Sequence, residues 1–277
     1  MEAAFAELPR EEFLGHGPWL IIPVEADDDS PTGRKGSFIS GDPIDLYQDV
    51  LVSIDRSRGL NNGQPSALAH WIHALGLRAG DRVFHAGCGV GYYTAILAEM
   101  VGPQGRVVAA EIDPELAARA KQNLAAWPHV AVHEADAAMA DTGMCDAMLI
   151  NAGVTCPHPA WLEHLKIGGR MAAPITCERG GLGSNGVMIK ATRLDTGYSA
   201  GILSYVSIYP CASAREQKLE GVVLKALKNR RLLRLRSVRL EPHALTGTCV
   251  VHGDGVCLSE ADPPSSPACQ AGANPLS

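Results

Sequence analysis

Residues 83–113, VFHAGCGVGYYTAILAEMVGPQGRVVAAEID, contain the pattern that decides the fold. An apolar run ends in the glycine-rich loop GCGVG at 87–91, and apolar residues at helical spacing follow this loop. A second apolar run at 107–110 leads to Glu111 and to Asp113, a favoured N-cap for a further helix. The order of strand, glycine loop, helix, strand and acid predicts half of a nucleotide-binding βαβ unit.

The residue types of this unit indicate what it binds. Glycines allow a sharp turn and let a ligand approach the backbone closely. A carboxylate at the end of the second strand, here Glu111, can accept hydrogen bonds from the hydroxyls of a ribose. The loop reads GxGxG rather than GxGxxG, so a pyrophosphate at the helix N-terminus is poorly supported. A ribose-binding acid without a pyrophosphate loop favours S-adenosylmethionine, which carries no phosphate.

Strands and helices continue to alternate after this unit. Strand-like runs follow at 130–133, 146–150 and 170–175, and Gly168-Gly169 predicts a turn before the last of them. This alternation predicts an α/β fold with a doubly wound, mostly parallel sheet, on which ligands bind beyond the C-terminal ends of the strands. Four such ends are expected to meet in one crevice, and they carry the loop at 87–91, Glu111, Asp136 and Asn151.

The flanking segments are less regular. Residues 25–36 predict a loop, residues 45–54 a strand, and NNGQP at 61–65 a turn directly before a helix. Toward the C-terminus, residues 237–258 predict two strands closed by a turn at 253–255. These segments extend the central α/β pattern on both sides.

Composition bounds the remaining possibilities. The chain has 277 residues, is 46% hydrophobic and carries a net charge of −6, which suits one large domain with a substantial core. No run approaches the ~18 apolar residues of a membrane span, and the first residues lack the pattern of a signal peptide. Eight cysteines show no paired spacing, and Cys88 lies inside the glycine loop. We therefore expect a cytoplasmic protein in a reducing compartment, with no membrane partner.

Positive charge is concentrated at 215–240, where nine Lys and Arg residues stand against two Glu residues. Such a segment is compatible with a nucleic-acid surface. No aromatic residues interleave with the charges, however, as single-stranded nucleic-acid binding would need. We interpret the segment as the solvated face of a helix followed by a half-exposed strand, and we do not expect nucleic acid as a partner.

Two groups of residues have a spacing that metal ligands can have. His70 and His73 lie three apart on one predicted helix, but a third ligand is missing. Cys249, His252 and Cys257 are loosely spaced, and a zinc site needs a fourth group. Because two strands and a turn also explain the second stretch, the sequence predicts no metal site.

Longer motifs surround the glycine loop. They are PREEF at 9–13, Tyr47 with Asp49, GQP at 63–65, GCGVGYYTAILAE at 87–99, LAARAKQNL at 116–124, and INAGV with WLEHLKIGGRMAAPI between 150 and 175. Through these motifs, residues 5–220 resemble the protein-L-isoaspartate O-methyltransferase family of class I S-adenosylmethionine-dependent methyltransferases. The resemblance implies a Rossmann-like sheet of seven strands with a reversed last hairpin.

We divide the chain on this basis into four segments. They are an N-terminal cap on the substrate side at 1–75, a cofactor-binding core at 76–214, a C-terminal helix and hairpin extension at 215–260, and a tail at 261–277. The tail is rich in Pro, Ser and Ala, and we expect it to be disordered.

The resemblance also implies roles for individual residues. The glycines of the loop would cradle the methionine part of S-adenosylmethionine, Glu111 would hold the ribose, and Asp136 with Ala137 would face the adenine. For His85 two interpretations stay open, a contact with the amino or carboxylate end of the cofactor and a side chain that fills the strand end. The predicted cofactor-binding residues are Gln64, His85, Gly87, Cys88, Gly89, Gly91, Glu111, Ile112, Asp136, Ala137 and Asn151.

This chain departs from the family pattern at two positions. Gly63 stands where the family usually has a Ser that handles the substrate carboxylate, and His85 stands where it usually has Asp or Glu. The amide of Asn62 could replace the missing hydroxyl, so Asn62 and Gly63 are the predicted catalytic residues, although a purely structural turn is the alternative. A carboxylate with a pKa of about 4 is ionised at pH 7, so its methylation needs alignment rather than a general base.

The function predicted from the sequence is methylation of a carboxylate on an isoaspartyl residue of a protein or peptide, by a monomeric enzyme involved in protein repair. One alternative keeps the methyltransferase class but changes the acceptor to another peptide or to a small molecule. The other alternative is a non-catalytic module that binds a cofactor or a partner. The sequence itself does not choose among these acceptors.

Overall fold

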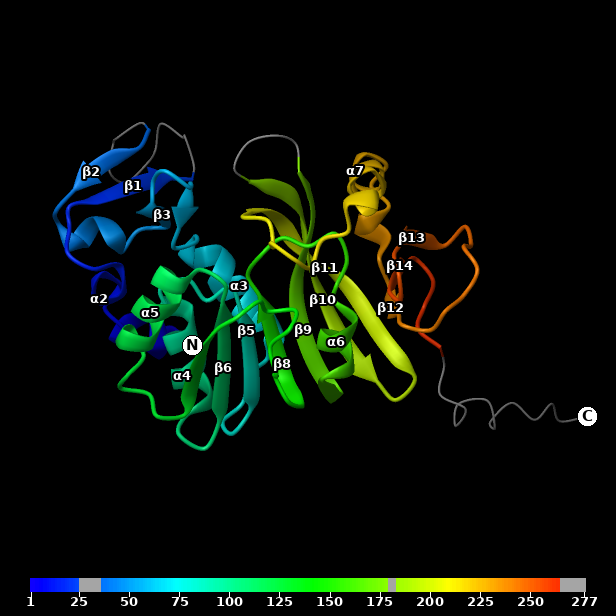
Figure 1. Cartoon of the computed structure of the whole chain (residues 1–277), viewed down its shortest axis with the longest axis horizontal. Helices are drawn as coiled ribbons and strands as arrows, with labels where there is room; N and C mark the ends of the chain where they lie inside the picture. The colour runs from blue at the N-terminus through cyan, green and yellow to red at the C-terminus, as the bar shows by residue number, and fades with distance from the viewer. Residues whose placement is uncertain (25–35, 179–182, 265–277) are drawn as a thin grey trace, which may run out of the picture. The chain divides into compact units, whose positions relative to one another are not determined.

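The computed structural model describes residues 1–24, 36–178 and 183–264 (Figure 1). The chain divides into two compact units, residues 1–142 and residues 143–277. The predicted loop at 25–36 lies outside the described residues except for Gly36, and so does the predicted tail from residue 265 onward.

The N-terminal part of the first unit folds into two short helices and a four-stranded antiparallel sheet in the order β2-β1-β3-β4. Its core includes the fully buried Ile21 and Val52. The strand predicted at 45–54 begins late, because the side chain of Asp42 accepts the N–H of Ile44 at 3.0 Å and starts a 3-10 turn instead. The elements are α1 (Glu2–Glu7), α2 (Arg10–Leu14), β1 (Trp19–Pro23), β2 (Phe38–Ser40), η1 (Pro43–Leu46), β3 (Val50–Asp55) and β4 (Leu60–Asn61).

The rest of the first unit is a parallel sheet of three strands with three helices. The register pairs Ala86 with Ala110 and Glu111 with Glu134, so the C-terminal ends of the three strands lie at one edge. The side chain of Asp113 caps α5 by accepting a backbone N–H of its first turn at 2.9 Å, as predicted. The elements are α3 (Pro65–Leu75), β5 (Arg82–Ala86), α4 (Tyr92–Val101), β6 (Arg106–Glu111), α5 (Pro114–Asn123) and β7 (Val130–Glu134).

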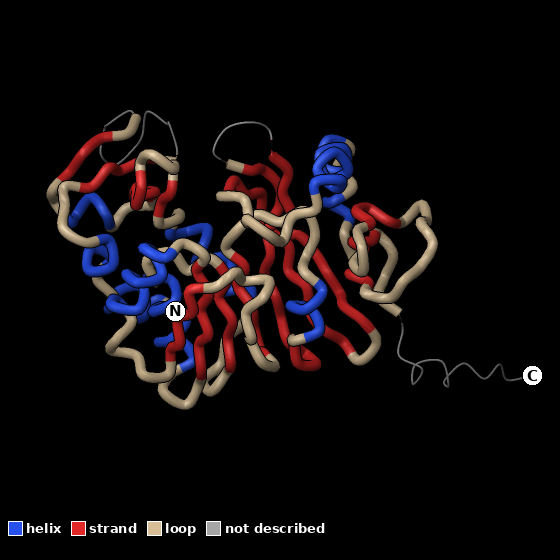
Figure 2. The backbone as a smooth tube through the Cα atoms, in the orientation of Figure 1, coloured by secondary structure: helices blue, strands red, loops and turns tan. Residues whose placement is uncertain are grey.

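The second unit is a mixed sheet in which the long strands β9, β10 and β11 run side by side (Figure 2). The pairing of β8 with β9 is parallel, and every described pairing from β10 onward is antiparallel. The strands are β8 (Cys145–Ile150), β9 (Leu165–Glu178), β10 (Ser184–Leu194), β11 (Gly197–Ile208), β12 (Ser237–Arg239), β13 (Cys249–His252) and β14 (Cys257–Ser259). The helices are α6 (Pro159–Glu163), η2 (Gln217–Leu219), α7 (Glu220–Lys228) and η3 (Leu232–Arg234).

The predicted α/β class, the reversed last hairpin and the C-terminal β extension are confirmed. In this extension β13 and β14 form an antiparallel hairpin, and β12 joins the hairpin to the edge of β11. Because β12, β13 and β14 belong to this extension, the count of seven strands that the resemblance implies for the sheet itself stays a prediction.

The turn predicted at Gly168-Gly169 is a bulge inside β9. The register of β9 against β8 is interrupted after Leu165 and resumes at Arg170. Gly168 has a φ of +77°, and a Cβ at Gly169 would lie 2.7 Å from the carbonyl oxygen of Lys166. These glycines are therefore needed for a kink within one strand, not for the start of a new one.

The basic segment at 215–240 is matched by acidic residues of the same unit. Arg231 and Arg234 both contact Glu260, and Arg236 contacts Asp262. The part expected to be one strand forms the 3-10 turn η3 and the short β12. Among the described residues, no helix has both the length and the apolar character needed to span a bilayer.

Candidate cofactor-binding site

The glycine loop leaves β5 and turns back over the end of β6. The N–H of Gly87 donates to the carbonyl of Ala110 at 2.8 Å. All three loop glycines have positive φ, but their surroundings differ. A Cβ at Gly91 would lie 2.8 Å from Leu124 Cδ1, whereas a Cβ at Gly89 would meet no atom within 4 Å. Gly91 therefore allows α4 to pack on α5, and Gly89 faces open space where a ligand can approach.

Glu111 connects the end of β6 to this loop. Its Oε2 accepts the N–H of Gly89 at 2.8 Å, and its Oε1 accepts the N–H of Asp113 at 3.1 Å. The side chain is buried, with 7% of the residue exposed. A carboxylate has about four lone-pair sites, so two bonds to the backbone leave acceptor capacity for the two hydroxyls of a ribose.

The end of β7 lies next to Glu111. The N–H of Ala135 donates to the carbonyl of Glu111 at 2.9 Å, which ties the chain after β7 to the end of β6. Asp136 then makes a local turn in which its Oδ1 accepts the N–H of Ala138 at 2.9 Å. Asp136 and Ala137 are half-buried, and Ile112 is 52% exposed. Glu111 and Asp136 thus lie at the same edge of neighbouring parallel strands.

His85 and Cys88 are buried and uncharged. The Nδ1 of His85 lies 2.9 Å from Thr94 Oγ1, and its Nε2 has no hydrogen-bond partner among the described residues. Burial lowers the pKa of His85 to about 3, so the imidazole is neutral at pH 7. Burial, together with the charge of Glu111, raises the pKa of the Cys88 thiol. The full burial of His85 favours the interpretation that it fills the strand end, and a contact with a cofactor stays a prediction.

The predicted catalytic turn is fixed by its backbone. Gly63 has a φ of +69°, and a Cβ there would lie 3.0 Å from Leu68 Cδ2. The N–H of Asn62 donates to the carbonyl of Val52 at 2.8 Å, and Asn62 is 7% exposed. The side-chain Nδ2 of Asn62 is buried without a hydrogen-bond partner among the described residues. This amide is therefore a buried donor without an acceptor among the described residues.

Arg10 lies beside this turn, and we did not predict it as a site residue. It is 1% exposed and donates to the carbonyls of Leu46 at 3.0 Å, Val50 at 3.1 Å and Gly63 at 2.9 Å. Its Nε has no partner among the described residues. The sequence shows Arg10 only as part of PREEF, because its contacts are all distant in the chain.

Gln64 is held at the start of α3. Its Nε2 donates to Asp49 at 2.6 Å, and Asp49 also accepts the N–H of Ser66 at 2.8 Å and its hydroxyl at 2.6 Å. Burial would raise the pKa of Asp49, but these hydrogen bonds and the charge of Arg10 outweigh it and lower the pKa. One N–H of the Gln64 amide is thus bound to Asp49, and the predicted contact of Gln64 with a cofactor stays a prediction.

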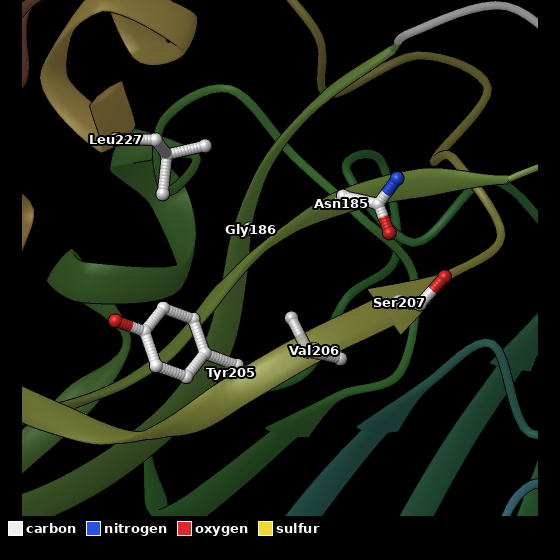
Figure 3. Close-up of a pocket in the computed structure, with 6 residues that line it drawn as sticks. All are labelled: Asn185, Gly186, Tyr205, Val206, Ser207 and Leu227. Atoms are coloured by element: carbon white, nitrogen blue, oxygen red, sulfur yellow. The ribbon is translucent and has the colours of Figure 1, made fainter. Parts of the chain in front are cut away.

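In the second unit, Asn151 directly follows β8 and is half-buried. Its predicted contribution to the site stays a prediction. This unit also has an open hollow of about 480 Å³ on β10 and β11, bordered by α7 (Figure 3). The hollow contains none of the predicted residues, and its lining residues are Asn185, Gly186, Tyr205, Val206, Ser207 and Leu227.

Known proteins of similar sequence point to one family. The family model of protein-L-isoaspartate(D-aspartate) O-methyltransferase (PCMT) matches residues 36–205. A protein-L-isoaspartate O-methyltransferase of Ignicoccus hospitalis is 33% identical over 138 residues, which are 48% of this chain and 64% of that relative. Protein-L-isoaspartate O-methyltransferase 1 of Archaeoglobus fulgidus is 36% identical over 134 residues, which are 46% of this chain and 62% of that relative, so the chain spans less than two thirds of the length of both relatives.

Solved structures agree on the fold. A protein-L-isoaspartate O-methyltransferase structure has a TM-score of 0.60 at 22% identity, over 88% of this chain and 68% of that one. A putative member from Plasmodium falciparum, solved with S-adenosyl-L-homocysteine, has a TM-score of 0.52 at 18% identity, over 60% of this chain and 81% of that one. These likenesses show the class I methyltransferase fold. Because the family model matches more than half of the residues of this chain, the chain belongs to the protein-L-isoaspartate(D-aspartate) O-methyltransferase family.

Proposed function

We propose that this chain is an S-adenosylmethionine-dependent methyltransferase that acts on the carboxylate of isoaspartyl residues in proteins or peptides. The observation that carries this proposal is the buried carboxylate of Glu111, bonded to the N–H of Gly89 at the C-terminal edge of a parallel sheet. Membership in the family supports the same reaction.

The residues at this edge suit an adenosyl group. Glu111 has unused acceptor capacity for ribose hydroxyls, and Gly89 leaves its Cβ direction open for the methionine part. The exposed side chain of Ile112 offers an apolar surface to the adenine, and Asp136 offers a hydrogen-bond acceptor. The related Plasmodium falciparum structure holds S-adenosyl-L-homocysteine, the product that remains after the methyl group has left.

S-adenosylmethionine, when bound, supplies a methyl group on a positively charged sulfur. The isoaspartyl carboxylate is already ionised at pH 7, so the protein does not have to remove a proton. Its residues have to orient the carboxylate oxygen and keep water away.

The turn at 61–64 offers groups that would hold this carboxylate. The Nδ2 of Asn62 is a buried donor without a partner among the described residues. The guanidinium of Arg10, bound to the neighbouring Gly63 carbonyl at 2.9 Å, adds positive charge beside it. Buried positive charge attracts an anion more strongly than the same charge in water. We assign Asn62 as the donor to the substrate, with Arg10 as a positioning residue for the turn.

A different acceptor is the second candidate. Gly63 has a positive φ, which Ser rarely adopts, and a Cβ there would lie 3.0 Å from Leu68 Cδ2, so this turn suits a residue without a side chain. Such a change at the substrate position favours an acceptor other than an isoaspartyl peptide, with the same cofactor.

The test combines a methyl-transfer assay with calorimetry on the full chain. Radiolabelled S-adenosylmethionine is supplied with an isoaspartyl peptide and with the matched peptide that contains ordinary Asp. Transfer to the first peptide alone supports the proposal. Cofactor binding without transfer to either peptide supports a different acceptor, and the absence of cofactor binding contradicts both candidates. A Glu111→Gln variant is the negative control for cofactor binding.

A further inference from the structure

Four potential metal ligands meet at the C-terminal end of the second unit. They are His243, Cys249, His252 and Cys257, and one ligand atom from each lies within 4.8 Å of the others. The two cysteines are buried and the two histidines are half-buried. None of these residues belongs to the proposed methyl-transfer site. The sequence showed three of them, but not the fourth ligand that a zinc site requires.

The pairing of β13 with β14 places three of these side chains on one face. His252 lies directly opposite Cys257, and Cys249 lies opposite Ser259. In a regular strand, residues three apart such as Cys249 and His252 face opposite sides. Here the register shifts between Cys249 and Val251, and this bulge returns Cys249 to the side of His252. The bulge explains why the spacing in the sequence looked too loose for a metal site.

His243 reaches the same place from the loop before β13. Its Nδ1 donates to the carbonyl of Glu241 at 2.9 Å, which fixes the tautomer and makes Nε2 an acceptor. This Nε2 lies 3.5 Å from the Sγ of Cys249. Metal-bound histidines in proteins have this arrangement, in which the second nitrogen donates to a carbonyl or a carboxylate.

The surroundings of His252 and Cys249 also suit metal ligands. The Nδ1 of His252 is buried without a hydrogen-bond partner among the described residues, an arrangement that a bound cation would explain. The N–H of Thr246 donates to the Sγ of Cys249 at 3.4 Å, and the Thr246 hydroxyl lies 3.3 Å from the same sulfur. Hydrogen bonds of this kind orient a thiolate ligand.

We propose that His243, Cys249, His252 and Cys257 bind one Zn²⁺ ion in a tetrahedral structural site. Zinc–sulfur and zinc–nitrogen bonds of about 2.3 and 2.0–2.1 Å place the ligand atoms of a tetrahedron about 3.4–3.8 Å apart. The 3.5 Å between the Cys249 sulfur and the His243 nitrogen lies in this range. Two thiolates and two imidazoles favour zinc over magnesium or calcium.

The site holds together short elements at the edge of the sheet. Four protein ligands leave no open coordination position, which is typical of structural zinc rather than catalytic zinc. The strands β12, β13 and β14 have only 3, 4 and 3 residues. Arg231 already anchors the preceding loop by donating to the carbonyls of Gly247 at 2.7 Å and Cys249 at 3.1 Å. Zinc would join this loop to both strands of the hairpin.

The proposal is tested on the full chain after reduction and removal of metal by a chelator. Zn²⁺ is titrated against a competing chromophoric chelator, and Co²⁺ is added separately to record its thiolate charge-transfer absorption. We expect one ion per chain. The His243→Gln and Cys257→Ser variants should bind Zn²⁺ at least about 100-fold more weakly, because loss of even an outer-shell partner costs about 10- to 100-fold. The Cys211→Ser variant removes a free cysteine of the same unit and should bind normally.

Two results would overturn the proposal. One is the absence of stoichiometric Zn²⁺ uptake by the reduced wild-type chain, and the other is equal uptake by wild type and both ligand variants. The position of His243 in a loop allows its variant to keep the fold, which far-ultraviolet circular dichroism verifies. The readout does not involve methylation, so its result is independent of the proposed function.

Discussion

The carboxylate of Glu111 accepts a hydrogen bond from the backbone N–H of Gly89 at 2.8 Å. This bond connects the end of β6 to the glycine loop that follows β5. Since the same carboxylate also accepts the N–H of Asp113, the loop and the start of α5 are held by one buried charge. The loop is therefore ordered before any ligand arrives, which reduces the entropy cost of binding.

Replacement of this charge should weaken the binding of S-adenosylmethionine. In Glu111→Gln the side chain keeps its shape, but a neutral amide replaces the charged acceptor. A hydrogen bond to a charged group contributes about 1.5–3 kcal/mol, so we expect affinity to fall about 10- to 100-fold by isothermal calorimetry. Glu115→Gln, a matched change at an exposed acid of α5, should leave affinity unchanged. Equal affinities of the two variants would contradict the assignment of Glu111.

Two glycines of the loop should have different roles: Gly91 is needed for packing and Gly89 for ligand binding. Both Gly89→Ala and Gly91→Ala place a side chain at positive φ, which costs about 1–2 kcal/mol. Gly91→Ala also drives its Cβ against Leu124 and should lose about 1–3 kcal/mol more in urea unfolding. Gly89→Ala should instead show the greater loss of cofactor affinity. The reverse order would mean that the cofactor does not approach at Gly89.

Local patterns were enough to predict the central α/β elements. The glycine loop, the Asp113 cap and the acid at the end of β6 each depend on neighbours close in sequence, and their elements are confirmed. The 3-10 turn at η1 and the bulge at Gly168 were not predicted. At η1, the Asp42 side chain caps a 3-10 turn in a segment whose strand propensity predicted a strand. At Gly168, a kink within one strand has the same glycine signal as a turn.

The distant contacts could not be read from the sequence. Arg10 binds carbonyls of three segments far along the chain, and nothing in its own surroundings in sequence indicates this. His243 likewise joins Cys249, His252 and Cys257 only because a loop folds back and a bulge changes the facing of β13. The predicted roles of the site residues stay predictions, because they concern ligands rather than the fold.

Restoring the family's serine should destabilise this protein. Gly63→Ser forces a side chain into a backbone with a φ of +69° and brings its Cβ to 3.0 Å from Leu68. We expect a loss of about 1–2 kcal/mol in the free energy of unfolding. Gly41→Ser is the matched control, because a Cβ at Gly41 meets no atom within 4 Å and its φ is not positive, so its effect should stay within about 0.5 kcal/mol. A stabilised Gly63→Ser protein would contradict this account.

His85 should make stability depend on pH. Its pKa is about 3 in the folded state because of burial, and about 6.5 when unfolded, so acid protonates the unfolded chain first. Stability from this site is present above pH 6.5 and is lost as pH falls, by about 1.4 kcal/mol between pH 7.5 and pH 5.5.

Urea unfolding at the two pH values measures this dependence. In His85→Gln the loss of stability between the two pH values should be smaller by about 1.4 kcal/mol. Only the difference between the two pH values is compared, so the absolute stability of the variant does not matter. His16→Gln, at an exposed histidine near the N-terminus, should keep the wild-type dependence. If His85→Gln shows the same pH dependence as wild type, then His85 is not neutral and buried in solution.

Asn62 should affect the substrate and not the cofactor. Its buried Nδ2 has no hydrogen-bond partner among the described residues, so removal of this atom breaks no hydrogen bond within that part of the chain. With an isoaspartyl peptide, Asn62→Ala should raise KM about 10-fold, as expected from one lost hydrogen bond to a charged group. Asn62→Asp should raise KM further, because two negative charges then face each other. Calorimetry should give unchanged S-adenosylmethionine affinity for both variants. Unchanged methylation kinetics in Asn62→Ala would leave the 61–64 turn with a structural role alone.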